Sequence, residues 1–243
     1  TNLREIIQAA FDNSFTTTLI TNGHALTEDL VRFLFARNVT LVVSLFSVQK
    51  ELYEMDNGLP DSHHKTIENI RMAAGVYREA NRIVNGKHVR RMAIHATVQA
   101  DNLADLQNIE MFCDEIGIFF SLAPLAAVGG GACHSELLIS EDGMADAGMH
   151  GHNSIILSRT ASREVRRQVC GTCLYGLNVG FDGNVLFDAH AGYDVGGLLG
   201  NVRRDSIDVL VKRQRKFAPA LFRNITGFCP VRDPAWPGFL KRL

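Results

Sequence analysis

The stretch RMAIHATVQADNLADLQNIEMFCDEIGIFFSLA, residues 91–123, contains a complete strand, helix and strand unit. An apolar, β-branched run at 91–99 is followed by 103–116, where apolar side chains recur at three- and four-residue spacing, and then by a second apolar run at 118–123. Parallel strands covered on both faces are short and largely apolar, and a helix usually connects them. The stretch therefore predicts two parallel strands of an α/β sheet.

The same alternation extends toward the N-terminus. The further predicted elements are strands at 16–21 and 39–45 and helices at 3–11, 28–37 and 66–81. A helix precedes the first of these strands, so the series begins in mid-unit. We therefore expect the later part of a partial (β/α)6 TIM-like barrel, with further strands ahead of Thr1. A small open α/β sheet that starts with a helix is the alternative.

Short polar side chains precede two of the predicted helices. Thr27 is expected to cap the helix at 28–37, and Asp101 and Asn102 are expected to cap the helix at 103–116. These residues give each helix a defined start.

The pattern changes toward the C-terminus. Residues 1–128 form the predicted barrel part, 129–169 an irregular connector, and 170–243 a small α+β domain built on a β-hairpin. The hairpin is predicted at 174–188, because Asp182-Gly183 between two apolar runs favours a tight turn. A helix from about Ser206 to Phe217, capped by Asp205 or Ser206, is expected to close this domain.

Composition narrows the possible partners. The 25 Lys and Arg residues nearly balance the 26 Asp and Glu residues, so no large positive field favours nucleic acid or an anionic membrane. The longest uncharged stretch, 116–134, contains Pro124 and three successive glycines, which argues against a membrane span. The N-terminal residues lack the basic start and apolar core of a secretory signal, so we expect a cytoplasmic protein.

Three pieces of the first 106 residues resemble the radical S-adenosylmethionine (SAM) enzyme family. They are LITNG at 19–23, VVSL at 42–45 with DNG at 56–58 and TIENI at 66–70, and ATVQADN at 96–102 followed by LADL. Each piece is weak alone, but their order and spacing are typical of this family. The resemblance implies a SAM-binding barrel with a 4Fe–4S cluster.

The family's defining CxxxCxxC motif is absent, since no cysteine precedes Cys113. That motif supplies three thiolates to the cluster and leaves one iron open for SAM. We expect these ligands upstream of Thr1. A family member that has lost its cluster is the competing interpretation. Cys113 itself falls on a predicted helix among apolar residues and is expected to be a core residue.

The C-terminal part resembles the twitch or SPASM appendage of the family. The resemblance is carried by Cys170, the Asp182-Gly183 hairpin and LGNV at 199–202. It implies an auxiliary iron–sulfur cluster. An odd total of five cysteines, in a chain too large to need disulfides, also favours metal or catalytic thiols.

This appendage departs from the family pattern at Asp188, where a cysteine usually follows the hairpin. The candidate metal ligands are Cys170, Cys173, Cys229 and Asp188, with His190 as an alternative fourth ligand and Cys133 as a further thiol. Zinc bound by the CxxC pair, and an auxiliary site that has lost its metal, stay open. Cys173 is also a candidate hydrogen-atom donor to a substrate radical.

Polar residues follow the predicted parallel strands at their carboxyl ends, where α/β proteins bind ligands. Thr21, Asn22, Ser44 and Asn102 lie at such ends, and the resemblance places them near the methionyl carboxylate and ribose of SAM. Turn or cap chemistry is the alternative for both asparagines. His95 lies on the opposite strand face from Met92 and Ile94, where it would contact substrate or cofactor or serve as a structural histidine.

The resemblance implies reductive cleavage of SAM to a 5′-deoxyadenosyl radical, which abstracts a hydrogen atom from substrate. We expect a natural-product substrate, as in carbohydrate- or aminoglycoside-type epimerases and dehydrogenases, and a reductant such as flavodoxin or ferredoxin. The alternatives are a maturase that modifies a ribosomally synthesised peptide, a non-catalytic relative that acts as partner or scaffold, and an ordinary barrel enzyme with a zinc-stabilised appendage.

Overall fold

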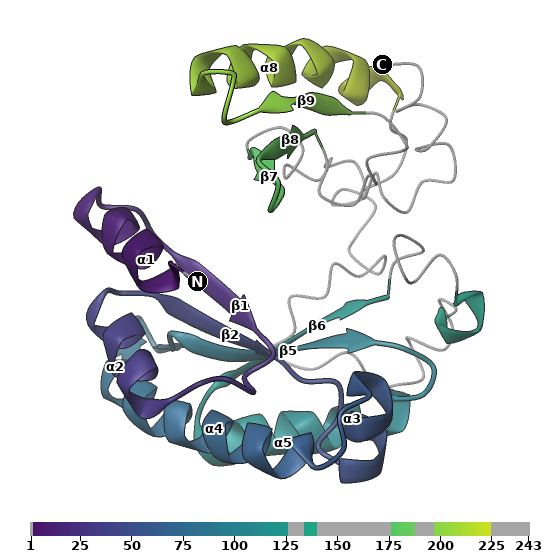
Figure 1. Cartoon of the computed structure of the whole chain (residues 1–243). Helices are drawn as coiled ribbons and strands as arrows, with labels where there is room; N and C mark the ends of the chain where they lie inside the picture. Colours follow the sequence, from purple (N-terminus) through teal and green to yellow (C-terminus); the bar gives the residue numbers. More distant parts are fainter. Residues whose placement is uncertain (1, 126–133, 140–175, 188–196, 225–243) are drawn as a thin grey trace. The chain divides into compact units, whose positions relative to one another are not determined.

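The computed structural model describes residues 2–125, 134–139, 176–187 and 197–224, with only the backbone described at 217–224 (Figure 1). Two compact units are present. The first holds the described residues up to Leu125 together with Ile139, and the second holds those at 134–138 and from 176 onward. No helix in these described ranges is long and apolar enough to cross a membrane.

A four-stranded parallel sheet forms the centre of the first unit. Its strands are β1 (Thr18–Thr21), β2 (Thr40–Ser44), β5 (Met92–Val98) and β6 (Phe119–Pro124), in that order across the sheet. All four lie within two residues of the predicted boundaries, so the prediction of a parallel α/β sheet is confirmed. Closure into a partial barrel stays a prediction.

The predicted helices are also present. They are α1 (Leu3–Asp12), α2 (Glu28–Ala36), α4 (Ser62–Tyr77) and α5 (Leu106–Ile116), with 3₁₀ turns at Arg78–Ala80 and Leu103–Asp105. Figure 1 shows α2, α4 and α5 beneath the same side of the sheet. The predicted Thr27 cap is confirmed, because its Oγ1 accepts a hydrogen bond from the Leu30 backbone N–H at 3.3 Å.

The helix-covered side of the sheet contains the hydrophobic core. Side chains alternate along β5, so that Met92, Ile94, Ala96 and Val98 are buried while the residues between them are only partly buried. They pack in one cluster with residues such as Ile70 of α4. Full burial of an aliphatic side chain contributes about 1.5–3 kcal/mol. This core holds the carboxyl ends of the strands at one edge of the sheet.

Two local elements were not predicted. Helix α3 (Lys50–Asn57) occupies a segment expected to be a loop, and it ends at Gly58 in the left-handed conformation. Strands β3 (Arg82–Val84) and β4 (Lys87–Val89) form an antiparallel hairpin directly after the segment at 66–81 that was expected to be helical. Its turn residues, Asn85 and Gly86, both have positive φ, as an Asn-Gly hairpin turn requires. That dipeptide was the signal for this hairpin.

The second unit contains an antiparallel sheet in the order β7 (Asn178–Val179), β8 (Asn184–Leu186) and β9 (Leu198–Asn201). A hairpin forms where Asp182-Gly183 predicted it, with Gly183 at φ 83°. Helix α8 (Ile207–Asn224) follows. The expected end at Phe217 is wrong, because the helix continues through Pro219, whose missing N–H removes only one backbone hydrogen bond.

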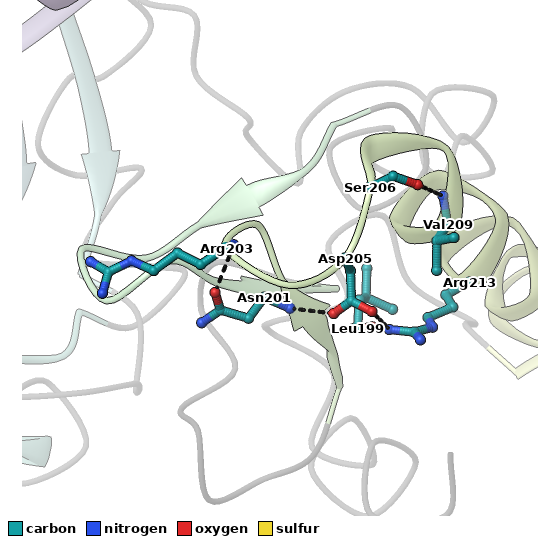
Figure 2. Close-up of polar contacts among 7 residues, drawn as sticks. All are labelled: Leu199, Asn201, Arg203, Asp205, Ser206, Val209 and Arg213. Atoms are coloured by element: carbon teal, nitrogen blue, oxygen red, sulfur yellow. Dashed lines mark hydrogen bonds and ion pairs between the residues drawn. The ribbon is translucent and has the colours of Figure 1, made fainter.

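Asp205 joins β9 to α8 in this unit (Figure 2). Its carboxylate accepts a hydrogen bond from the Asn201 backbone N–H at 2.9 Å and forms an ion pair with Arg213 at 3.1 Å. Arg213 also donates to the Leu199 carbonyl at 2.7 Å. Of the two expected caps, Ser206 bonds the Val209 N–H at 3.4 Å, whereas Asp205 ties the helix to the strand.

Gly200 lies beneath this connection at φ 150°. A Cβ atom at this position would come within 2.8 Å of Leu210 and closer still to the Asp205 and Arg213 side chains. Only glycine lets the strand pass so near the helix.

Candidate functional site

Three polar side chains lie side by side on the face of the parallel sheet opposite the core. In the strand register Ser44 of β2 pairs with His95 of β5, and His95 pairs with Ser121 of β6. Aligned residues of neighbouring parallel strands share a face. Ser44 is exposed, while His95 and Ser121 are partly buried. We call these three residues the polar row, and they are the candidate ligand-binding group.

The residues next to the polar row belong to the other face. Val43 and Ile94 precede Ser44 and His95, and both are fully buried in the core. On the open face, Ile20 of β1 is 66% exposed. Among the described elements, α2, α4 and α5 cover the opposite side of the sheet, and the polar row is exposed at Ser44 and partly buried at His95 and Ser121.

His95 is held by a short chain of hydrogen bonds. Its Nδ1 lies 3.0 Å from Ser121 Oγ, and Ser121 Oγ donates to the Ile94 carbonyl at 3.2 Å. A serine hydroxyl has one proton, so when Ser121 donates it to the Ile94 carbonyl, its Oγ accepts from the Nδ1–H of His95. Burial lowers the pKa of His95, which favours the neutral ring. In that arrangement of the hydroxyl proton, Nε2 of the neutral ring is an acceptor.

Thr21 does not join the polar row. It pairs with Val43 in the register and so lies on the helix-covered face. Its Oγ1 accepts a hydrogen bond from the Gly23 N–H at 3.3 Å. Thr21 and Ser44 both end their strands as predicted, but their side chains lie on opposite faces, because side chains alternate and Thr21 is one residue out of phase. The predicted contact of Thr21 with SAM stays a prediction.

Asn22 has the turn role that was its alternative. Its Oδ1 accepts from the His24 N–H at 3.2 Å. Gly23 follows at φ 79°, and a Cβ there would lie 2.9 Å from Val43 Cγ1. The Thr-Asn-Gly segment is thus a tight turn packed against the sheet.

Asn102 is fully buried and is occupied by backbone contacts. Its Nδ2 donates to the Phe46 carbonyl at 3.0 Å and the Thr97 carbonyl at 2.9 Å, and its Oδ1 accepts from the Gln99 N–H at 2.9 Å. It makes no side-chain cap, so the expected capping of the following helix by Asn102 is wrong. Its amide instead joins the segments that leave β2 and β5.

Asp105 was missed by sequence reasoning. It is fully buried, and its carboxylate accepts from Ser47 Oγ, the Val48 N–H at 2.8 Å, Gln49 Nε2 at 2.9 Å and Asn108 Nδ2 at 2.7 Å. Burial alone would raise the pKa of Asp105, but these four hydrogen bonds hold it below its ordinary value. An acidic residue at a helix start indicates a cap, and nothing in the sequence pointed to the loop after β2.

The cysteine predictions divide between described and undescribed residues. Cys113 is buried in α5, and burial strongly raises the pKa of its thiol, so its expected core role is confirmed. Cys170, Cys173, Cys229 and Asp188, together with His190 and Cys133, lie outside the described residues. Within the described ranges, no three His, Cys, Asp or Glu side chains form a metal site.

No known protein family matches the chain, and no curated protein sequence does. Solved structures match, including Streptococcus suis SuiB bound to S-adenosylmethionine, with TM-score 0.60 and 17% identity over 88% of this chain. Native anSMEcpe with bound AdoMet gives TM-score 0.59 and 14% identity over 88%. A complex of anSMEcpe with AdoMet and a peptide gives TM-score 0.57 and 14% identity over 98%.

The chain spans 53% of the length of SuiB and 63% of the length of the first anSMEcpe structure. The SuiB structure contains bound S-adenosylmethionine, and the anSMEcpe structure contains bound AdoMet. Similarity at 14–17% identity establishes a fold rather than an activity. The chain therefore shares the fold of these two SAM-bound structures.

Proposed function

We propose that this chain is part of a radical SAM enzyme that binds S-adenosylmethionine at the carboxyl end of its parallel sheet and acts on a peptide. The supporting observation is that the fold shared with SAM-bound SuiB presents the exposed Ser44 at the end of β2, next to His95 of β5. Ligands of open α/β sheets bind outside the carboxyl ends of the strands.

Ser44 is the proposed SAM-binding residue of this chain. It is the last residue of β2, its side chain is exposed, and the neighbouring position on β5 is His95. A hydroxyl group can both donate to a carboxylate and accept from a ribose hydroxyl. Thr21, Asn22 and Asn102 then act on the site through the backbone, since their side chains bond to turn and loop atoms.

We also propose a 4Fe–4S cluster, whose ligands lie outside the described residues. Cys113 is the one cysteine that the structure describes, and it is buried in the core on α5. A cluster that leaves one iron open for SAM takes three thiolates. The described residues do not provide this set, so their proposed roles are confined to binding and orienting the organic ligand.

A peptide is the favoured substrate. Two similar anSMEcpe structures contain a bound peptide together with AdoMet. These peptide complexes favour the peptide-maturase alternative over the natural-product expectation. An auxiliary cluster at Cys170, Cys173, Cys229 and Asp188, hydrogen donation by Cys173, a flavodoxin or ferredoxin reductant and a cytoplasmic location remain further proposals.

The test uses full-length protein reconstituted anaerobically with iron and sulfide. We expect calorimetry to detect SAM binding, and chromatography to detect 5′-deoxyadenosine after reduction with dithionite. Ser44→Ala should weaken SAM binding about tenfold, the effect of losing one good hydrogen bond. Thr40→Ala is the matched control, because Thr40 lies four residues earlier on the same strand face. Wild-type protein that neither binds nor cleaves SAM would contradict the proposal.

A further inference from the structure

His95 carries a chemical asymmetry that its neighbours create. One ring nitrogen, Nδ1, is engaged by Ser121, which is itself engaged by the Ile94 carbonyl. No described residue forms a hydrogen bond with Nε2. The Ser121 contact thus holds the orientation of the ring, and with the Ser121 proton on the Ile94 carbonyl the Nε2 edge presents a lone pair.

The position of His95 in the sheet determines what the Nε2 lone pair can contact. The ring belongs to the open face of the sheet, and Ser44 lies beside it on the adjacent strand. Neighbouring strands are about 4.8 Å apart, so a ligand held by Ser44 lies within reach of the imidazole. Apolar neighbours on the same face, Val42 and Ala93 one row earlier, offer no competing hydrogen-bond donor.

We propose, on the basis of the proposed function, that His95 Nε2 accepts a hydrogen bond from a hydroxyl or amino group of the bound adenosyl ligand. Ser121 is the positioning residue that keeps the proton on Nδ1. This role differs from that of Ser44, which can both donate and accept. The burial that lowers the pKa of His95 supports the role, because a protonated ring would have no acceptor.

Two substitutions separate the two edges of the ring. His95→Asn places an amide nitrogen near the position of Nδ1, so the contact with Ser121 can persist while the Nε2 acceptor is lost. His95→Gln places an amide oxygen near the position of Nε2 and keeps the acceptor. Calorimetric SAM titrations of full-length, cluster-reconstituted protein should show about tenfold weaker binding for His95→Asn and less than about threefold for His95→Gln.

The protonation of each ring nitrogen of His95 can be measured directly. In ¹⁵N spectra of the imidazole side chains, wild-type His95 should show a protonated Nδ1 and an unprotonated Nε2. Ser121→Ala should shift the ring toward the Nε2–H form. Diethylpyrocarbonate, which reacts with unprotonated imidazole nitrogen, should modify His95 in the free protein, and SAM should protect it. Peptide mass spectrometry distinguishes His95 from the other histidines.

The outcomes are distinct. A wild-type protein that binds SAM while His95→Asn binds equally well overturns the ligand contact and leaves the proposed function standing. A protonated Nε2 in the wild type also overturns it. A wild-type protein that does not bind SAM overturns the proposed function and the contact together. Should His95→Asn fail to fold, the spectrum and the SAM protection of wild-type His95 decide the question.

Discussion

Two groups of polar residues near the carboxyl end of the parallel sheet differ in where their hydrogen bonds go. Asn102 and Asp105 are fully buried, and their side chains bond to the loops after β2 and β5 and to the start of α5. The polar row of Ser44, His95 and Ser121 has some internal bonds but keeps accessible atoms on the open face. Both groups lie near the site, but only the polar row has polar atoms that a ligand can reach.

This difference separates two roles that look alike in sequence. A buried polar group must be paired, because an unpaired one costs about 1–3 kcal/mol. Asn102 and Asp105 therefore determine the conformation of the loops. A residue with an open acceptor or donor can exchange water for a ligand at little cost, and it is such residues that carry recognition.

The largest expected effect is that of Asp105→Ala on stability. The substitution removes the acceptor of four donors, of which the Ser47 hydroxyl is fully buried and the Val48 N–H and the Asn108 amide are partly buried, so the free energy of unfolding should fall by about 3 kcal/mol. Urea unfolding followed by circular dichroism measures it. Asp114→Ala on the exposed side of α5 is the control and should change stability by less than about 0.5 kcal/mol. Equal effects of the two substitutions would remove the distinction between the groups.

Asn102→Ala should cost about 2 kcal/mol in the same measurement, since it leaves two carbonyls and one N–H without partners. Asn102→Asp should cost more, because a carboxylate would face the Phe46 and Thr97 carbonyls. If Asn102→Ala were as stable as the wild type, its amide would be free for ligand binding and the original cofactor prediction would regain support.

Acid should weaken the buried group by a smaller amount. The folded-state pKa of Asp105 lies below its unfolded value of about 3.9, so its stabilising contribution is complete above that pH and is lost as pH falls through the folded pKa. The stability difference between wild type and Asp105→Asn should therefore be constant near neutral pH and shrink below about pH 4. A difference that instead grew on acidification would contradict the depressed pKa.

Ser44→Ala should have the smallest effect on stability, within about 0.5 kcal/mol, because its side chain is exposed. The same variant is expected to bind SAM less tightly. Substitution of Ser44 should thus change binding rather than stability, whereas substitution of Asp105 should lower stability. A thermal melt and a SAM titration on one preparation test the expected stability and the expected loss of binding. A large stability loss without a change in binding would place Ser44 with the structural residues.

Local sequence patterns predicted much of the first unit. The apolar runs around Val43 and Ile94 marked the strands, and apolar spacing around Ile109 marked α5. His95 was placed on the correct strand face by alternation alone. The hairpin at Asn85-Gly86 was missed although its turn signal is local, whereas α3 has a weak apolar pattern and begins without a side-chain cap.

The sequence by itself determined the parallel α/β arrangement and the face on which His95 lies, because both follow from periodicities of a few residues. Only the tertiary structure decided that Asp105 supports the loop after β2, 56 to 58 residues away along the chain. It also decided that Ser44, His95 and Ser121 share one row while Thr21 does not. Strand register and long-range hydrogen bonds arise from packing of the whole sheet, and no short segment contains them.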